Sequence, residues 1–532
     1  MKKQAKRIFW NAMLLTASTL LVRTVGVSFQ VYVSNRAGAE AMGLFSLMSG
    51  VYGFALTLAT SGIHLGVTHV VIDAVGRGEE HRIRGAMRRA VCYSLFFGCL
   101  ASLLLVGFAE PIGTGWLRDA RTVPSLRLFG ITLPLISLSS AFGGYFTAMR
   151  RAYKNAIVQV LEQMLKIGFT SYLLTLFFAK DIESTCAMLV LGGVLAEVAS
   201  FLFEWVLYLT DRSRSRGAID RSRARADGKM LIGISLPIAL TAYARSGLIT
   251  LEHILIPAGL RNSGVSHAAA LTAYGCIQGM ALPIVLYPAA LISAFSGLLV
   301  PELAECRVQE SRVRIRYMIS RVWSLALLFS IGTAGILLCF SGELGESLYP
   351  DTDAGKYIRL LAPLIPIMYV DTATDAMLKG LGEQVYSMKI NILDALISVI
   401  LVWLLVPHMG IGGYLVTIYF SETFNTVFSV TRLLSISHTP VRVWKWVGKP
   451  LFCVVGATCM ARMVLLWLAP AFSLGVLPIT LHILLAVGLY LILLRMMGGI
   501  DREDLEWISS LFRWERPVRL RLIRRGKRIS KK

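Results

Sequence analysis

Apolar stretches of about 20 residues follow one another along almost the whole of this chain. A helix of that length rises about 30 Å, which matches the hydrocarbon core of a bilayer. Charged residues make up only 16% of the 532 residues, whereas a soluble protein carries about a quarter. The stretches do not alternate with the period of two that barrel strands require. The sequence therefore predicts an all-α polytopic membrane protein.

The apolar stretches divide the chain into about fourteen predicted membrane-spanning helices. Basic residues gather in alternate loops, as the positive-inside rule requires, and this alternation predicts that both termini are cytoplasmic. The formal net charge of +22 then reflects membrane topology, so we expect no nucleic-acid partner. The expected spans are residues 8–33, 41–70, 90–109, 124–148, 155–179, 183–209, 231–257, 268–299, 318–341, 357–379, 388–406, 411–436, 446–469 and 473–496.

The N-terminal segment has the basic start and apolar run of a signal peptide, but the run is too long and contains Arg23. We therefore expect it to be the first membrane helix. The external loops are too short for a folded catalytic domain, which argues against a membrane glycosyltransferase or ligase. The chain has no phosphate-binding loop for ATP and no cluster with metal-site spacing. We expect a protein that is not an enzyme and that has no cofactor and no metal centre.

The first six predicted helices and the next six match in order. Residues Gly43–Ser46 parallel Thr272–Gly275, and Leu133–Ile136 parallel Ala362–Ile365. Because six is even, both halves run in the same direction, which is a parallel repeat about an axis along the membrane normal. The expected divisions are an N-terminal six-helix bundle (1–209), a basic cytoplasmic linker (210–230), a C-terminal six-helix bundle (231–437), two extra membrane helices (438–498) and a basic cytoplasmic tail (499–532).

Three segments of the chain resemble a known family. They are Gly38–Leu47, Tyr274–Pro283 and Ala156–Gln163, and the similarity extends over most of residues 8–437. The chain resembles the stage V sporulation protein B and polysaccharide-export family. That family belongs to the multidrug/oligosaccharidyl-lipid/polysaccharide (MOP) exporter superfamily and is related to the lipid II flippases.

The resemblance implies two parallel six-helix bundles that form a V-shaped central cavity. It also implies that two C-terminal helices, roughly residues 446–496, shelter a lipid tail. The chain departs from the family pattern at three positions. His64 follows Gly-Ile in place of proline, Thr68-His69 stands where a basic residue usually follows serine, and Glu252 stands where aspartate is usual. These departures leave the coupling ion and the substrate open.

Two arginines lie within predicted spans, Arg23 in the first helix of one half and Arg245 in the first helix of the other. A guanidinium at membrane depth costs roughly 2.5–3.5 kcal/mol or more, so it faces a cavity or a partner. Its planar fork suits the oxygens of a diphosphate. The sequence Arg23–Gly26 resembles an Arg-x-x-Gly of flippase first helices, which implies a cavity position for Arg23. The alternative is a structural ion pair with a carboxylate such as Glu252 or Asp371.

Glu252 lies seven residues after Arg245 and shares its helix face. By resemblance to the lipid II flippases, Glu252 and Asp394 are candidates for holding a coupling cation, Na⁺ or H⁺. An equally weighted alternative is that Glu252 balances the charge of Arg245.

The resemblance favours a flippase or exporter that moves an undecaprenyl-diphosphate-linked oligosaccharide or cell-wall precursor across the bacterial cytoplasmic membrane by alternating access. The alternative within the superfamily is a multidrug or organic-cation antiporter, whose cavity should be acidic and lack paired arginines. We expect a monomer. The basic tail is either solvated or docked on anionic membrane lipids, where each basic residue adds about 1 kcal/mol.

Overall fold

The computed structural model describes residues 2–77, 79–176, 181–212, 221–468 and 476–499. Within these residues the regular structure is helical, with no strand, which confirms the predicted all-α class. Residues 213–220 of the predicted linker and the predicted tail beyond residue 499 lie outside the described residues.

The first half of the chain begins with α1 (Lys2–Thr60), which bends at Gly38. The φ of 81° at Gly38 suits a residue without a Cβ, and the bend divides α1 into a first arm (2–37) and a second arm (39–60). The remaining elements of this half are α2 (Ile63–Gly76), α3 (Glu80–Gly107), η1 (Pro111–Trp116), η2 (Ala120–Thr122), α4 (Val123–Ala148), α5 (Ala152–Leu176) and α6 (Ile182–Arg212).

The predicted span 41–70 is wrong as a single helix, because α1 ends at Thr60 and α2 begins at Ile63. Gly62 lies between them with a φ of 76°. A Cβ at Gly62 would clash with the backbone of Ser235 on α7 (Arg221–Asn262). The helix therefore breaks where α7 approaches, a contact that the local sequence does not reveal.

The second half begins with α7, which starts inside the segment predicted as a linker. The predicted span 268–299 is also wrong as a single helix, because the helix breaks at Tyr287 and Pro288, and proline cannot donate a backbone hydrogen bond. The other elements of this half are α8 (His267–Gly275), η3 (Cys276–Ala281), α9 (Leu282–Leu286), α10 (Ala289–Val308), α11 (Arg312–Leu348), α12 (Ala354–Leu361), η4 (Ala362–Leu364), α13 (Ile365–Gly380), α14 (Gln384–Met409) and α15 (Ile411–Ser437). After them come η5 (Trp444–Gly448), α16 (Lys449–Leu468) and α17 (Val476–Met496).

Eleven helical segments of the described residues are long and apolar enough to cross a membrane. One of these segments, Thr19–Gly76, runs from the first arm of α1 through α2 and so includes part of the predicted span 8–33 and all of the span 41–70. The predicted span 268–299 is instead divided between two of the segments, His267–Leu286 and Ala289–Val308. Three other predicted spans correspond to α5, to α12 through α13, and to α15, which are helical but are not among the eleven. In α13 the reason is length, since this helix has only 16 residues. The total of about fourteen crossings stays a prediction.

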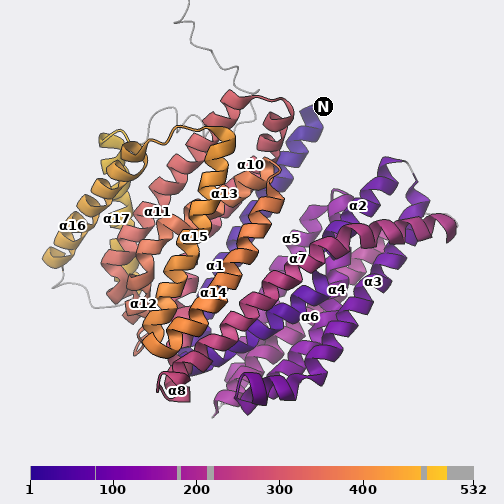
Figure 1. The fold of residues 1–532 in the computed structure, drawn as a ribbon, viewed down its shortest axis with the longest axis horizontal. Coiled ribbons are helices and arrows are strands. Elements are labelled where there is room, and N and C mark those ends of the chain that lie inside the picture. The colour runs from indigo at the N-terminus through magenta and orange to yellow at the C-terminus, as the bar shows by residue number, and fades with distance from the viewer. Residues whose placement is uncertain (1, 78, 177–180, 213–220, 469–475, 500–532) are drawn as a thin grey trace, which may run out of the picture.

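The helices form two bundles arranged as a V (Figure 1). Helices α2 to α6 lie in one bundle, and α10 to α15 lie in the other. The bundles meet near α8 and diverge toward the end that carries the N-terminus. Helices α16 and α17 pack against each other and against α11, on the outer side of the second bundle (Figure 1). This arrangement agrees with the predicted two-bundle class with two additional helices.

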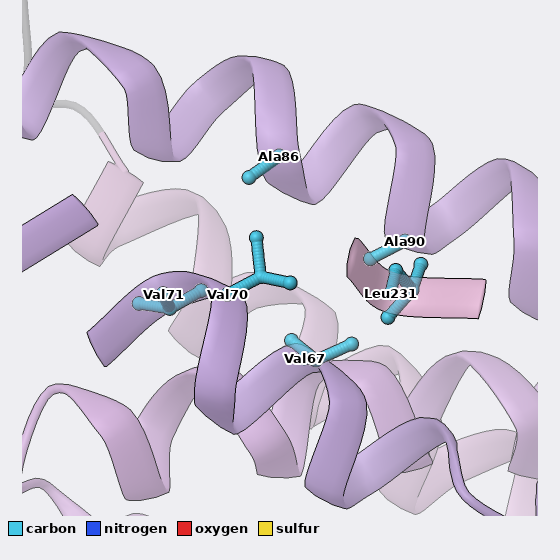
Figure 2. Close-up of a pocket in the computed structure, with 6 residues that line it drawn as sticks. All are labelled: Val67, Val70, Val71, Ala86, Ala90 and Leu231. Carbon is cyan, nitrogen blue, oxygen red and sulfur yellow. The ribbon is translucent and has the colours of Figure 1, made fainter. Parts of the chain in front are cut away.

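Helix α7 connects the two bundles, because it packs against α2 and α3 at one end and against α14 further along. Near its start, Ser235 Oγ donates a hydrogen bond of 2.9 Å to the carbonyl of Gly62. Figure 2 shows the apolar junction beside this contact, where α7 meets the first bundle. The junction is lined entirely by aliphatic side chains and is no candidate for a charged substrate: Val67, Val70, Val71, Ala86, Ala90 and Leu231.

Candidate functional site

Arg23 lies on the first arm of α1 and its side chain is exposed. Next to it, Thr24 Oγ1 and the hydroxyl of Tyr287 form a hydrogen bond of 2.9 Å. Further along the arm, Gln30 donates a hydrogen bond of 2.9 Å to the carbonyl of Gly279. The charge of Arg23 also acts on Tyr369 of α13. Hydrogen bonds thus connect the arm that carries Arg23 to elements of the second half.

Arg245 lies on α7 and is also exposed. Hydrogen bonds connect α7 to the second arm of α1 beside this residue. The neighbouring Ser246 accepts a hydrogen bond of 3.1 Å from Thr57, and Tyr243 donates one of 3.2 Å to the carbonyl of Leu58. The charge of Arg245 acts on two carboxylates of the other bundle, Asp371 on α13 and Asp394 on α14.

Neither guanidinium forms an ion pair within 4.0 Å among the described residues. The alternative that Arg23 or Arg245 is held in a structural ion pair with Glu252 or Asp371 therefore has no such contact in its favour. An exposed cation at membrane depth without a protein partner is chemically suited to an anionic ligand. Each of these two cations lies on the first helix of one half and is attached to the other half.

Polar side chains of α13, α14 and α15 form a second cluster. Asp394 accepts a hydrogen bond of 2.7 Å from Ser421, and Asn425 donates one of 3.3 Å to Asp371. Asn391 donates to the backbone of Ser387 at 2.8 Å. Oδ1 of Asp371 and Oδ1 of Asn425 are buried and have no hydrogen-bond partner within the described part of the chain.

Glu252 lies on α7, which packs against α14, the helix that carries Asp394. Its neighbour His253 is fixed by a hydrogen bond of 2.7 Å between Nδ1 and the hydroxyl of Tyr274. The two acids predicted for cation coupling therefore lie on helices that pack against each other. Across the residues that the structure describes, no three His, Cys, Asp or Glu side chains gather as metal ligands. Any cation here would rely on neutral oxygens as well.

Sequence reasoning missed Ser421 and Asn425, although a signal was present. Ser421, Asn425 and Ser429 follow one another at steps of four on α15, so they line one face of this helix. A second polar contact joins α13 and α14 at Asp375. Lys379 pairs with Asp375 at 2.6 Å, and Ser387 of α14 donates a hydrogen bond to the same carboxylate.

Two family models match the chain. The model described as Polysaccharide biosynthesis protein matches residues 8–258, and the MatE model matches residues 262–404. Together the two matches run from the first arm of α1 into α14. They therefore cover both arginines and both predicted coupling acids.

Known proteins resemble the chain over most of its length. Stage V sporulation protein B of Bacillus subtilis (strain 168) is 25% identical over 442 residues, which are 81% of this chain and 85% of that protein. A solved structure of lipid II flippase MurJ in an inward closed conformation has a TM-score of 0.66 at 12% identity. It covers 94% of this chain and 100% of its own.

A solved inward-facing multidrug resistance MATE family transporter of the MOP superfamily has a TM-score of 0.57 at 15% identity. It covers 81% of this chain and 100% of its own. At such identities the solved structures establish the fold alone, and the family models add the sequence relationship. The chain therefore belongs to the multidrug/oligosaccharidyl-lipid/polysaccharide exporter superfamily of membrane transporters, and it combines a polysaccharide biosynthesis match in its first half with a MatE match in its second.

Proposed function

We propose that this transporter moves a polyprenyl-diphosphate-linked glycan, an oligosaccharide or a cell-wall precursor, across the bacterial cytoplasmic membrane by alternating access. The observation that carries this proposal is the pair Arg23 and Arg245, which are exposed and form no ion pair among the described residues. The likeness to stage V sporulation protein B and to a lipid II flippase supports the same class of substrate.

The diphosphate supplies the chemistry that two guanidinium groups bind well. Each guanidinium presents paired N–H donors to phosphate oxygens, and such charge-assisted bonds contribute roughly 1.5–3 kcal/mol each. The headgroup would occupy a water-filled cavity between the bundles while the polyprenyl tail remains in lipid. The exposed apolar side chains of α16 and α17, such as Phe452 and Leu484, suit contact with that tail.

The arrangement of the bundles suits loading from the cytoplasm. We propose that both termini are cytoplasmic, as the distribution of basic loop residues predicts. The V then diverges toward the cytoplasm and is closed at the α8 end, which faces outward (Figure 1). A rocking motion of the bundles would transfer the headgroup to the outer side.

The cluster around Asp394 is the proposed site for a coupling cation, Na⁺ or H⁺. Two observations support this role: Glu252 and Asp394 lie on the packed helices α7 and α14, so their negative charges act on each other, and Ser421 adds a neutral oxygen beside Asp394. A bound cation would relieve that repulsion. The other reading, in which Glu252 balances Arg245, has less support because Arg245 acts on Asp371 and Asp394.

The other proposals concern the membrane lipids and the oligomeric state. We propose that the basic tail, residues 499–532, docks on anionic lipids of the inner leaflet. We further propose that the protein acts as a monomer and carries out transport without covalent chemistry, since the cavity lies within one chain.

A second candidate function is export of organic cations. The MatE match and the acidic cluster of α13 to α15 favour it. The arginines Arg23 and Arg245 oppose it, because a cationic substrate would be repelled by both of them.

The test is flipping of a fluorescent undecaprenyl-diphosphate glycan in proteoliposomes. We expect Arg23→Ala and Arg245→Ala each to slow flipping by about 10- to 100-fold, the equivalent of one lost charge-assisted hydrogen bond. Arg23→Lys should lie between, since lysine keeps the charge but loses the planar fork.

The matched control is Arg127→Ala, which removes an exposed arginine that pairs with Glu110 at 3.5 Å outside the site. Flipping should be unaffected in this variant. Normal flipping in both arginine-to-alanine variants of the site would contradict the diphosphate assignment. Ethidium export without lipid flipping would identify the organic-cation antiporter.

A further inference from the structure

The closed end of the V carries a polar cluster well apart from the two proposed substrate arginines. We call it the outer cluster, and it consists of Glu40, Asp119, Arg121, Arg261 and His267. Three of these residues belong to the first half of the chain and two belong to the second. The cluster therefore joins the halves at the point where outward opening must separate them.

The first-half side of the outer cluster is held by hydrogen bonds within that half. Asp119 caps η2 and accepts a hydrogen bond of 3.0 Å from the backbone N–H of Arg121. The guanidinium of Arg121 contacts both oxygens of Asp119, with the shortest distance 2.7 Å, and reaches Glu40 of α1 at 3.2 Å. Burial disfavours the charge on Asp119, but the hydrogen bonds from Arg121 and His267 outweigh it and lower the pKa of Asp119. Asp119 is therefore a fixed, ionised acceptor.

The second-half side reaches across to this acceptor. His267 is the first residue of α8, and its Nε2 lies 3.0 Å from Oδ2 of Asp119. Arg261, in the last turn of α7, lies 3.0 Å from Nδ1 of His267 and donates to the carbonyl of Leu117 at 3.3 Å. Because arginine only donates, Nδ1 must be the acceptor and Nε2 must carry the proton. His267 is thus a neutral bridge between a donor of its own half and an acceptor of the other.

The backbones of the two halves also approach closely beside the outer cluster. A Cβ at Gly275 of α8 would clash with the carbonyl of Ala39, the residue before Glu40. The halves can therefore part here only by breaking the bonds from His267 to Asp119 and from Arg261 to Leu117. The bonds of Arg121 to Asp119 and Glu40 lie within the first half and would survive.

We propose that His267 and Asp119 form a lock that holds the outer side of the transporter closed and that opens when the bundles rock outward. The proposal rests on the alternating-access part of the proposed function and is independent of the substrate. His267 acts as the positioning residue, because it connects Arg261 to Asp119. The lock sets the ratio of outward-open to outward-closed molecules in the absence of substrate.

The test measures the distance between the halves by pulsed electron spin resonance. Spin labels are attached to cysteines introduced at Thr114 in η1 and Lys356 in α12, which are both exposed and lie outside the outer cluster. The full-length chain, with its native cysteines replaced, is reconstituted in nanodiscs without substrate. Three variants are compared with this background: His267→Leu, His267→Gln and Arg127→Ala.

We expect His267→Leu to raise the ratio of long to short label distances by about tenfold, because it removes both side-chain bonds of the bridge. Glutamine keeps one donor and one acceptor, so His267→Gln should retain the distribution of the unmodified background. Arg127→Ala breaks an ion pair within the first half and should also change nothing. An unchanged distance distribution in His267→Gln would show that the shift in His267→Leu comes from the lost hydrogen bonds and not from a general loss of structure.

A label distribution in His267→Leu equal to that of the background would overturn the lock. An equal shift in Arg127→Ala would overturn it too, since that pair does not cross between the halves. Where His267→Leu does not fold, Arg261→Ala provides the same comparison, because it removes the bonds to His267 and Leu117. A shift in His267→Leu without glycan flipping in the unmodified chain would support the lock and contradict the proposed substrate.

Discussion

At the scale of single residues, the chain carries several polar groups whose protein partners are incomplete. Arg23 and Arg245 form no ion pair among the described residues, and within the same residues Oδ1 of Asp371 and Oδ1 of Asn425 are buried without a partner. Each unsatisfied buried acceptor costs about 1–3 kcal/mol. Both acceptors belong to the polar cluster of α13, α14 and α15 that contains Asp394. The cation proposed for this cluster would satisfy them. A cation bound at this proposed site would offset the cost of leaving them unpaired.

The proposed cation site predicts a specific effect of Asp394→Asn. Loss of one negative ligand should raise the Na⁺ concentration for half-maximal glycan flipping by about tenfold or more, because cation affinity depends on the number of charged ligands. The measurement is a sodium titration of flipping in proteoliposomes. The matched control is Asp375→Asn, since Asp375 is already paired with Lys379 at 2.6 Å. The same sodium dependence in both variants would remove Asp394 from the coupling site.

At the scale of helices, glycines decide how closely the halves meet. Gly43 on the second arm of α1 and Gly275 on α8 face each other, and a Cβ at either position would clash with the backbone of the other helix. Small residues at such a crossing allow membrane helices to pack by van der Waals contact. The crossing adjoins the outer cluster, so helix packing and polar contacts close the same end of the molecule.

Substitution of Gly43 should therefore separate the two helices. We expect Gly43→Ala to reduce the free energy of unfolding by roughly 1–3 kcal/mol, because overpacking forces the backbones apart. Gly53→Ala on the same arm is the control, since no heavy atom of the described residues lies within 4 Å of a Cβ built there. Alanine at Gly53 should be neutral or slightly stabilising. Denaturant unfolding of the two variants in micelles measures the difference, and equal stability would refute the close crossing.

At the scale of the whole molecule, the first helix of each half is attached to the other half. Thr24 of α1 bonds to Tyr287 of the second half, while Ser235 of α7 bonds to Gly62 of the first. In the proposed rocking motion, each arginine-bearing helix therefore remains bonded to both halves of the molecule. This connection gives a physical route from motion of the bundles to the spacing of Arg23 and Arg245.

Outward movement of an anionic headgroup predicts sensitivity to membrane potential. A potential negative inside favours export by roughly 2.3 kcal/mol per charge per 100 mV. At equal Na⁺ and pH on both sides, collapse of a potassium diffusion potential should slow glycan flipping several-fold. The control is the same ionophore in liposomes that have no potassium gradient. A rate that does not depend on potential would show that charge transfer contributes nothing to transport.

Several features were predictable from the sequence because they depend on local composition. Arg23, Arg245, Glu252 and Asp394 stand out as ionisable residues within apolar stretches. Ser421 and Asn425 were harder to recognise, since neutral polar side chains change hydropathy little. The break at Gly62 could not be predicted, because its cause is contact with Ser235, 173 residues away.

Hydropathy and periodicity act over about one helix at a time, so the amino-acid sequence was sufficient for the helical membrane class, the internal repeat and the positions of charge within apolar stretches. The attachment of each first helix to the opposite half required the packed molecule. So did the meeting of His267 with Asp119 across a separation of 148 residues. Such pairs depend on how distant surfaces pack, and neither partner carries a local signal of the other.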